Sequence, residues 1–479
     1  MENTLISGLD YLVISLYLIG IFVLAFKSGR LSTQASGNYI EDQYLAGKSL
    51  TFAESLCSII ATEVSALTFL GIPAFAYGAD FSFVQIYIGA IFGRIIIARY
   101  FLPKVYDQGL TVYSVMGRNG NKNGQRSIAI FYLINKVLAV GVRLFSGSIL
   151  VATFFDVSIY LAVGIICLLT FFYTLIGGLK AVVRTDMVQM GLFIFGGLVA
   201  HYMIPEISEE SWGDLFAMAY SHGKTTIIDF SNVWPFLTGV IGGILFDMAT
   251  HGVDQDFAQR LTANKDIKTA QKAIILSSFL SIFVGLLFLG IGSLLWSHYQ
   301  LNVSPDVPND FLFAHFITQY FPAGIKGLML AGVLAATMST LDSTINALSA
   351  TFYSDILGHE TTDKDQIKKF YTRDTLIITA ILMLIAFIAS TSDQLLLLGL
   401  KITSWTAGSL VALFMANVLF QNKIKAKLTP GSVIGSYGIG IFLVYINTFQ
   451  LQWAWQWNVY LACAGSLVFL YLKGIIESK

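Results

Sequence analysis

The sequence SLCSIIATEVSALTFLGIPAFAYG, residues 55–78, decides the fold. Its ends are apolar, its centre at residues 61–68 is polar, and Gly71 and Pro73 follow. A helix broken in the middle of a membrane leaves backbone carbonyls without partners, and these bind a cation where they line a cavity. A kink that serves packing alone is the alternative for this stretch.

A second interrupted stretch lies at residues 232–256. There Gly242 and Gly243 precede Asp247, Thr250 and His251. Two interrupted helices in corresponding places of two halves of a chain are the best sequence indication of a transporter site. We therefore expect a binding site at the level of the two breaks.

The composition agrees with a chain that lies in a membrane. Of the 479 residues, 55% are hydrophobic and 12% charged, and the mean hydropathy is +0.70. Soluble domains carry about 25% charged residues. The formal net charge is zero, so we expect no nucleic-acid partner. The three cysteines lie far apart in apolar stretches, which indicates buried thiols rather than disulfides or a metal set.

Hydrophobic length predicts an all-α integral membrane protein of one domain, residues 1–479, with about 13 transmembrane helices. A spanning helix needs about 20 apolar residues. The first of them, a leader helix at 8–28, lacks the basic start and cleavage site of a signal peptide. Ten core helices are predicted at 50–77, 81–103, 127–155, 157–176, 181–204, 232–256, 271–298, 322–355, 374–391 and 394–420, and two trailing helices at 429–447 and 455–473. We expect short helices in the polar segments 205–231 and 299–321.

The loops predict the orientation of the chain. With the N-terminus outside, nearly all basic loop residues fall on the cytoplasmic side, including Arg260, whereas the external loops carry Lys224 and several acids. This asymmetry is what the positive-inside rule requires. We therefore expect a multi-pass protein of the inner (plasma) membrane with its C-terminus in the cytoplasm.

Ionisable residues at membrane depth point to function. Each costs at least ~2.5–3.5 kcal/mol at the centre of a helix on insertion scales, so each needs a partner or a role. They are Glu54, Glu63, Arg143, Asp186, Asp247, His251, Asp342 and Lys401. For any one of them, a structural ion pair is as good an interpretation as a functional site.

The predicted helix 322–355 carries a face of oxygen atoms. Ala336, Ser339, Thr340 and Ser343 lie at i, i+3, i+4 and i+7 and so share one side, with Asp342 at its edge. A hard cation prefers several oxygen ligands, and sodium suits such a set. Hydroxyl groups also occur at plain helix–helix contacts in membranes, which is the alternative.

Several strings along the chain resemble the sodium/solute symporter family. They are YLAGKSL (44–50), ATEVSALTF (61–69), GGLKAVVRTDMVQ (177–189), HGVDQDFAQR (251–260) and AATMSTLDSTINALSAT (335–351). The resemblance covers roughly residues 40–420. It implies the leucine-transporter type of fold, with two inverted five-helix repeats at about 50–420 flanked by the leader helix and the two trailing helices.

The resemblance also implies sodium sites. The first lies between the helices at 50–77 and 322–355, with carbonyls of Ala61, Val64 and Ala336 and hydroxyls of Ser339 and Thr340 as ligands. Some family members bind a second sodium ion, whose positions here are Asp186, Ser339, Asp342 and Ser343. Asp342 stands where the family usually has a hydroxyl residue. Besides a second sodium ion, proton coupling through Asp186 and Asp342 stays open.

By alignment with the family, nine residues are candidates for solute contacts. They are Glu63, Ser65, Thr68, Gln85, Arg143, Asp247, Thr250, His251 and Lys401. Arg143 is suited to a carboxylate, and Glu63 or Asp247 to an amine or hydroxyl groups. The alternative for Arg143 is an ion pair with Glu63 or Asp186.

Together these observations predict a sodium-coupled symporter that imports a small organic solute by alternating access. The solute classes left open are carboxylates, amino acids, acidic sugars and polyols, and we expect no organic cofactor and no obligate protein partner. Alternatives are a proton-coupled or sodium-independent transporter of the same fold, and a membrane sensor. An intramembrane enzyme is disfavoured because no catalytic motif lies at membrane depth.

Overall fold

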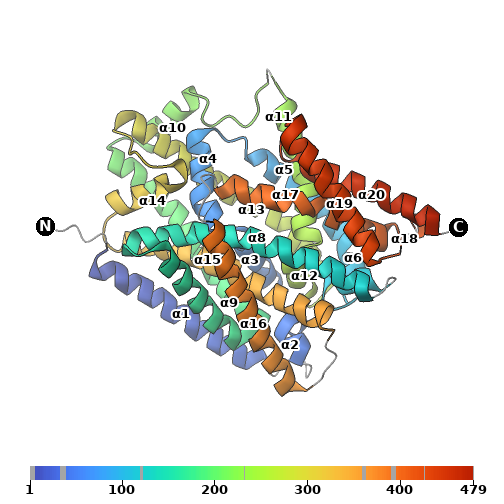
Figure 1. Ribbon diagram of the computed structural model, residues 1–479. Helices are drawn as coiled ribbons and strands as arrows, with labels where there is room; N and C mark the ends of the chain where they lie inside the picture. Colours follow the sequence, from blue (N-terminus) through green and yellow to red (C-terminus); the bar gives the residue numbers. More distant parts are fainter. Residues whose placement is uncertain are drawn as a thin grey trace.

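The computed structural model describes residues 6–32, 39–118, 122–230, 232–358, 363–389, 395–424 and 427–477 (Figure 1). In this part of the chain all regular structure is helical, apart from one bridge between Leu50 and Asn264. The longer helices are α1 (Gly8–Ser32), α3 (Phe52–Glu63), α5 (Val84–Ile96), α8 (Lys122–Phe155), α9 (Ile159–Ser208), α11 (Trp234–Asp247), α13 (Ile267–Leu301), α15 (Ile325–Thr351), α16 (Lys364–Ala389), α17 (Leu395–Phe414), α19 (Pro430–Ile446) and α20 (Trp457–Glu477).

Shorter helices connect or extend these. They are α2 (Tyr39–Leu45), α4 (Ile72–Gly78), α6 (Leu102–Val105), α7 (Val112–Gly117), α10 (Trp212–Ser221), α12 (Gln255–Thr262), α14 (Asn309–Tyr320) and α18 (Gln421–Ile424). Helices α10 and α14 lie in the two polar segments where short helices were predicted, so that prediction is confirmed.

Ten helices among the described residues are long and apolar enough to cross a membrane, and two bent pairs raise the number to as many as 12. The predicted spans 157–176 and 181–204 run together in α9, whose 50 residues would extend about 75 Å at 1.5 Å per residue, against a hydrocarbon core of about 30 Å. The chain departs from helical geometry at Gly178 (φ 57°, ψ −164°). Any side chain there would meet the Gln43 carbonyl at 2.8 Å. The count of 13 stays a prediction.

The first bent pair is the interrupted helix predicted from residues 55–78. Helix α3 begins at a capping box made by Thr51 and Glu54 and ends at Glu63, where Val64 turns to extended backbone. The Ser65 N–H group donates to Thr68 Oγ1 at 3.3 Å rather than continuing the helix. A π-helical segment, η2 (Leu67–Gly71), then leads into α4. The chain bends by 61° between α3 and this continuation.

The second bent pair is α11 with α12. Helix α11 passes into a π-helical segment, η4 (Met248–Gly252), and the chain bends by 64° before α12. Asp254 caps α12 by accepting from the N–H group of Asp256. Both interruptions predicted from the sequence are therefore present.

The oxygen-bearing helix α15 lies at the centre of the molecule (Figure 1). Every residue from Met329 to Thr351 is buried, and its largest packing partner is α9. The leader helix α1 packs on both, and Asp10 accepts from the N–H groups of Gly324 and Gly327 at 2.7 Å each. The trailing helices α19 and α20 pack on each other and on α17.

Helix α5 lies against α11 at glycine contacts. A methyl group at Gly89 would lie 2.2 Å from the Val240 carbonyl and 2.9 Å from Gly243 Cα. On the outside, many large apolar side chains are exposed, such as Leu16 at 61% and Phe172 at 55%. Such a surface suits contact with lipid.

Candidate sodium and solute sites

The break in the first core helix lies directly against α15. Ser339 Oγ lies 3.2 Å from the carbonyl oxygen of Ala61. Ala61, Val64, Ala336 and Ser339 border a void of about 10 Å³, close to the smallest volume that holds one water-sized particle. Thr340 lies beside them, with its hydroxyl donating to the Ala336 carbonyl at 3.0 Å. The five predicted ligands of the first sodium site thus lie together around unwound backbone.

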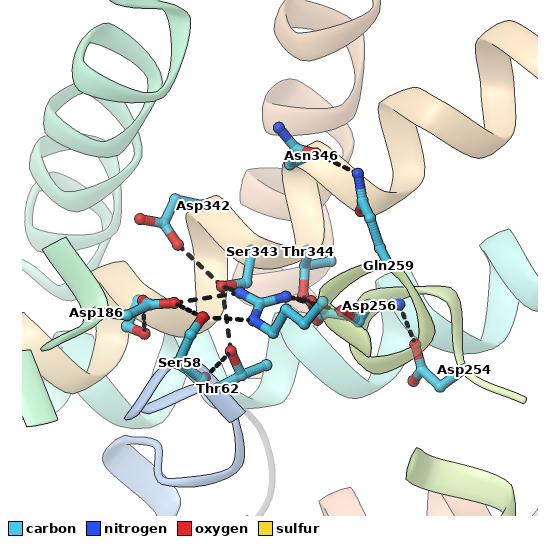
Figure 2. Close-up of polar contacts among 12 residues, drawn as sticks. Ser58, Thr62, Asp186, Asp254, Asp256, Gln259, Asp342, Ser343, Thr344 and Asn346 are labelled. Atoms are coloured by element: carbon cyan, nitrogen blue, oxygen red, sulfur yellow. Dashed lines mark hydrogen bonds and ion pairs between the residues drawn. The ribbon is translucent and has the colours of Figure 1, made fainter. Parts of the chain in front are cut away.

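The four residues predicted for a second sodium ion also lie together. Figure 2 shows Asp186, Asp342 and Ser343 side by side, and Ser339 contacts Asp186. Ser339 Oγ donates to Asp186 Oδ1 at 2.5 Å, and Ser343 Oγ donates to Asp342 Oδ1 at 3.1 Å. The Tyr173 hydroxyl group donates to the other oxygen of Asp342. The two carboxylates therefore flank the hydroxyl face of α15.

A guanidinium group already stands at this second position. Arg260 on α12 is fully buried, and its Nη2 donates to Asp186 Oδ2 at 3.3 Å and to Ser343. Its Nε donates to Ser58 Oγ at 2.8 Å, and its Nη1 pairs with Asp256 at 2.7 Å. Arg260 thus supplies a positive charge beside Asp186. The sequence analysis placed Arg260 in a cytoplasmic loop; Asp256, one helical turn before it, was the available signal for a buried pair.

Further polar contacts hold α12 against its neighbours (Figure 2). Lys136 on α8 pairs with Asp254 at 2.7 Å and with Asp256 at 3.1 Å. Thr344 on α15 donates to Asp256 at 3.1 Å. Helix α12 is therefore joined by ion pairs or hydrogen bonds to α3, α8, α9 and α15.

A cavity of about 120 Å³ opens beside the two helix breaks. At ~30 Å³ per water molecule, it has room for about four waters. Seven of the nine predicted solute contacts line it, namely Glu63, Ser65, Thr68, Arg143, Asp247, Thr250 and His251. Side chains from both breaks, from α8 and from α17 thus meet around one space, as a solute site requires.

The other two candidates lie elsewhere. Gln85 borders a neighbouring cavity of about 400 Å³, and its amide donates to the Ile227 carbonyl at 2.7 Å. Lys401 is exposed on α17 and does not border the central cavity, although Gly399 and Leu400 do.

One wall of the cavity is held from behind by Arg94, which the sequence analysis missed. Arg94 on α5 is fully buried, with its Nη2 2.8 Å from Glu63 Oε2 and its Nε 3.2 Å from Asp247 Oδ1. It also donates to Ser277 Oγ at 2.7 Å and to Ser281 Oγ at 3.2 Å, both on α13. Arg94 could have been found from the sequence, because it is a charged residue inside the predicted span 81–103. The other ionisable candidates were selected by this same criterion.

Arg143, on α8, lines the same cavity and is in a different situation. Within the described ranges it makes no hydrogen bond and no ion pair. Glu63 pairs with Arg94 and Asp186 with Arg260, so neither of the partners considered for Arg143 is bound to it. Arg143 is half-buried, and a guanidinium group without a protein partner at a cavity wall can receive an anion.

The sequence model of the sodium:solute symporter family matches residues 43–435. The chain belongs to this family. A sodium/glucose cotransporter of Vibrio parahaemolyticus is 27% identical over 475 residues, covering 92% of this chain and 86% of that protein. A sodium/sialic acid symporter, NanT, of Aliivibrio fischeri is 25% identical over 403 residues, covering 82% of this chain and 78% of that protein.

The fold agrees with this assignment. The solved structure of a Na⁺-coupled sialic acid symporter in a substrate-bound, outward-open state matches with a TM-score of 0.85 and 20% identity, covering 98% of each chain. The predicted family, the all-α membrane fold and the sodium symport function are confirmed. This member of the sodium:solute symporter family is thus a multi-pass membrane transporter and not an enzyme.

Proposed function

We propose that this symporter couples inward movement of one sodium ion to the import of a compact organic solute that carries a carboxylate group. The observation that carries the proposal is Arg143, a half-buried cation that has no partner among the described residues and lines a cavity of about 120 Å³. An Arg–carboxylate pair is charge-assisted and frequently bidentate. The small volume favours a short acid over a large sugar acid.

Sodium binds first, from outside, at the carbonyls of Ala61, Val64 and Ala336 and the hydroxyls of Ser339 and Thr340. The ion holds the broken first helix against α15, and the same break supplies Glu63, Ser65 and Thr68 to the solute cavity. This shared break is the physical link between the ion and the solute, because ordering it for one ligand prepares it for the other.

Release to the inside follows when the contacts of α12 break. Sodium then leaves into the cytoplasm, where its concentration is low. A membrane potential of about 100 mV supplies about 2.3 kcal/mol per ion, enough for roughly fiftyfold accumulation at ~1.4 kcal/mol per decade. We place the protein in the plasma membrane, with the N-terminus outside and the C-terminus in the cytoplasm, on the distribution of basic loop residues.

Because Arg260 stands beside Asp186 and Ser343, we assign one coupled sodium ion rather than two. A second ion at these residues would have to displace the guanidinium group or share its ligands. Measured sodium-to-solute stoichiometry tests this assignment, and two ions per solute would contradict it.

The experiment is uptake of radiolabelled carboxylates into proteoliposomes, with sodium or potassium outside and across a pH series. We expect uptake to require sodium and the Ser339→Ala and Thr340→Ala variants to need at least tenfold more sodium. Ser349→Ala, on the same helix but bonded to Thr375 at 3.4 Å, is the matched control. Sodium-independent uptake, or uptake driven by a proton gradient alone, contradicts the proposal.

A further inference from the structure

The solute cavity is lined by charged side chains of both signs. Arg143 lines it, and so do Glu63 and Asp247. No ion pair joins Arg143 to either acid in the described part of the chain. The charges that face the solute are therefore set by Arg143 alone and by the cluster of Glu63, Asp247, Arg94 and His251, which we call the acidic wall.

His251 contacts the other three members of the acidic wall. Its Nε2 lies 3.1 Å from Arg94 Nη2 and 3.8 Å from Glu63 Oε2. Its Nδ1 lies 2.9 Å from Asp247 Oδ1.

Within the acidic wall, Glu63 and Asp247 share the guanidinium group of Arg94. Two of its oxygens are also without donors. Asp247 Oδ2 is buried and accepts no hydrogen bond, and within the described ranges Glu63 Oε1 accepts none either. A buried charge with unmatched oxygens is costly unless a cation or a donor completes it.

We propose that the solute is a compact zwitterion, an amino acid or another short amino-carboxylate, with its carboxylate on Arg143 and its ammonium group on the acidic wall. A cation and two carboxylates around one small cavity match such a solute, whereas a simple carboxylate leaves Asp247 Oδ2 without a donor. This inference rests on the proposed function and names the chemical class of its solute.

The first test uses the wild-type protein in detergent with sodium present. Thermal shift and equilibrium binding are measured with the 20 common L-amino acids, β-alanine, L-lactate, D-glycerate and propionate. We expect an amino acid to bind most tightly, and its 2-hydroxy and unsubstituted counterparts to bind at least tenfold more weakly, because a charge-assisted hydrogen bond is lost. Alanine, lactate and propionate form one such matched set.

Two other outcomes are distinguishable. If carboxylates bind but removal of the amino group leaves the affinity unchanged in every matched set, the zwitterion inference is overturned and the proposed function stands. If no carboxylate or amino acid binds in sodium, the proposed function itself fails, and the inference with it.

A variant then locates the ammonium group. Glu63→Gln removes one of the two carboxylates of the acidic wall, and we expect the advantage of the amino acid over its 2-hydroxy counterpart to fall at least tenfold. Glu54→Gln is the matched control, because Glu54 lies on the same helix but pairs with Lys180 at 3.0 Å, away from the cavity. An unchanged preference in a folded Glu63→Gln protein contradicts the inference; if that variant does not fold, the wild-type measurement still decides.

Discussion

Arg94 and Arg260 are both fully buried, and each lies between two carboxylates, yet they connect different parts of the molecule. Arg94 holds α3, α11 and α13 around its own helix α5. Arg260 reaches from α12 to α9 and α15, the helices that carry Asp186 and Ser343. Arg94 therefore builds a wall of the solute cavity, whereas Arg260 ties the second broken helix to the helices that carry the sodium candidates.

The comparison shows that the role of a buried ion pair depends on which helices it connects. The partners of Arg94 can keep their places while a solute passes. The partners of Arg260 must separate if α12 moves to open the inner side. We expect loss of Arg94 to change solute recognition, and loss of Arg260 to change the balance between closed and open forms.

The largest expected effect is a loss of stability when either Arg94 or Arg260 is replaced. Arg94→Gln leaves Glu63 and Asp247 without their guanidinium partner, and Arg260→Gln does the same to Asp186, while Asp256 keeps Lys136. We expect each variant to lower the free energy of unfolding by about 3–5 kcal/mol. Thermal unfolding in detergent is the measurement. Lys48→Gln is the control, because Lys48 and its partner Asp107 are both partly exposed, at 31% and 56%; a change of about 0–1 kcal/mol is expected there. Equal effects in all three variants would contradict the comparison.

A second prediction tests how tightly α5, the helix of Arg94, is packed. Gly89→Ala places a methyl group 2.2 Å from the Val240 carbonyl of α11, and we expect a loss of about 1–3 kcal/mol from overpacking. Gly191→Ala on α9 has nothing within 4 Å of the new methyl group and should be neutral or slightly stabilising. Thermal unfolding of the two variants in parallel checks this. If Gly89→Ala leaves the free energy of unfolding unchanged, α5 and α11 separate easily.

A third prediction separates the two arginines. Cys57 is half-buried on α3, next to Ser58, which accepts from Arg260. In a background with Cys167→Ala and Cys463→Ala, we expect Arg260→Gln to raise the rate of Cys57 alkylation by a permeant maleimide about tenfold, a shift of ~1.4 kcal/mol. Arg94→Gln should raise it less. Equal rates of Cys57 alkylation in the two variants would contradict the different roles assigned to Arg94 and Arg260.

The smallest effect on stability is expected at Arg143, which is only half-buried. Because Arg143 has no partner in the described part of the chain, Arg143→Gln should leave the unfolding free energy within about 0.5 kcal/mol. Sodium-dependent uptake should nevertheless be lost. A marked loss of stability would show that Arg143 has a structural partner after all.

Much of this molecule could be predicted from its sequence. The fold class and family follow from apolar length and from strings such as ATEVSALTF and AATMSTLDST. The two helix breaks follow from polar residues, glycine and proline inside apolar runs, because these act on the local backbone. The shared face of Ser339 and Thr340 follows from helical periodicity alone.

Which charges meet was decided only by the tertiary structure. Arg260 looks like a loop residue in the sequence, and folds inward because Asp186 and Asp256 receive it there. Arg94 takes Glu63, which leaves Arg143 without a partner. Ion pairing depends on distances between helices that are far apart along the chain, and no local pattern encodes those distances. The sequence thus determined where the chain breaks and which face bears oxygen, and the packing of the helices decided which charge remains for the solute.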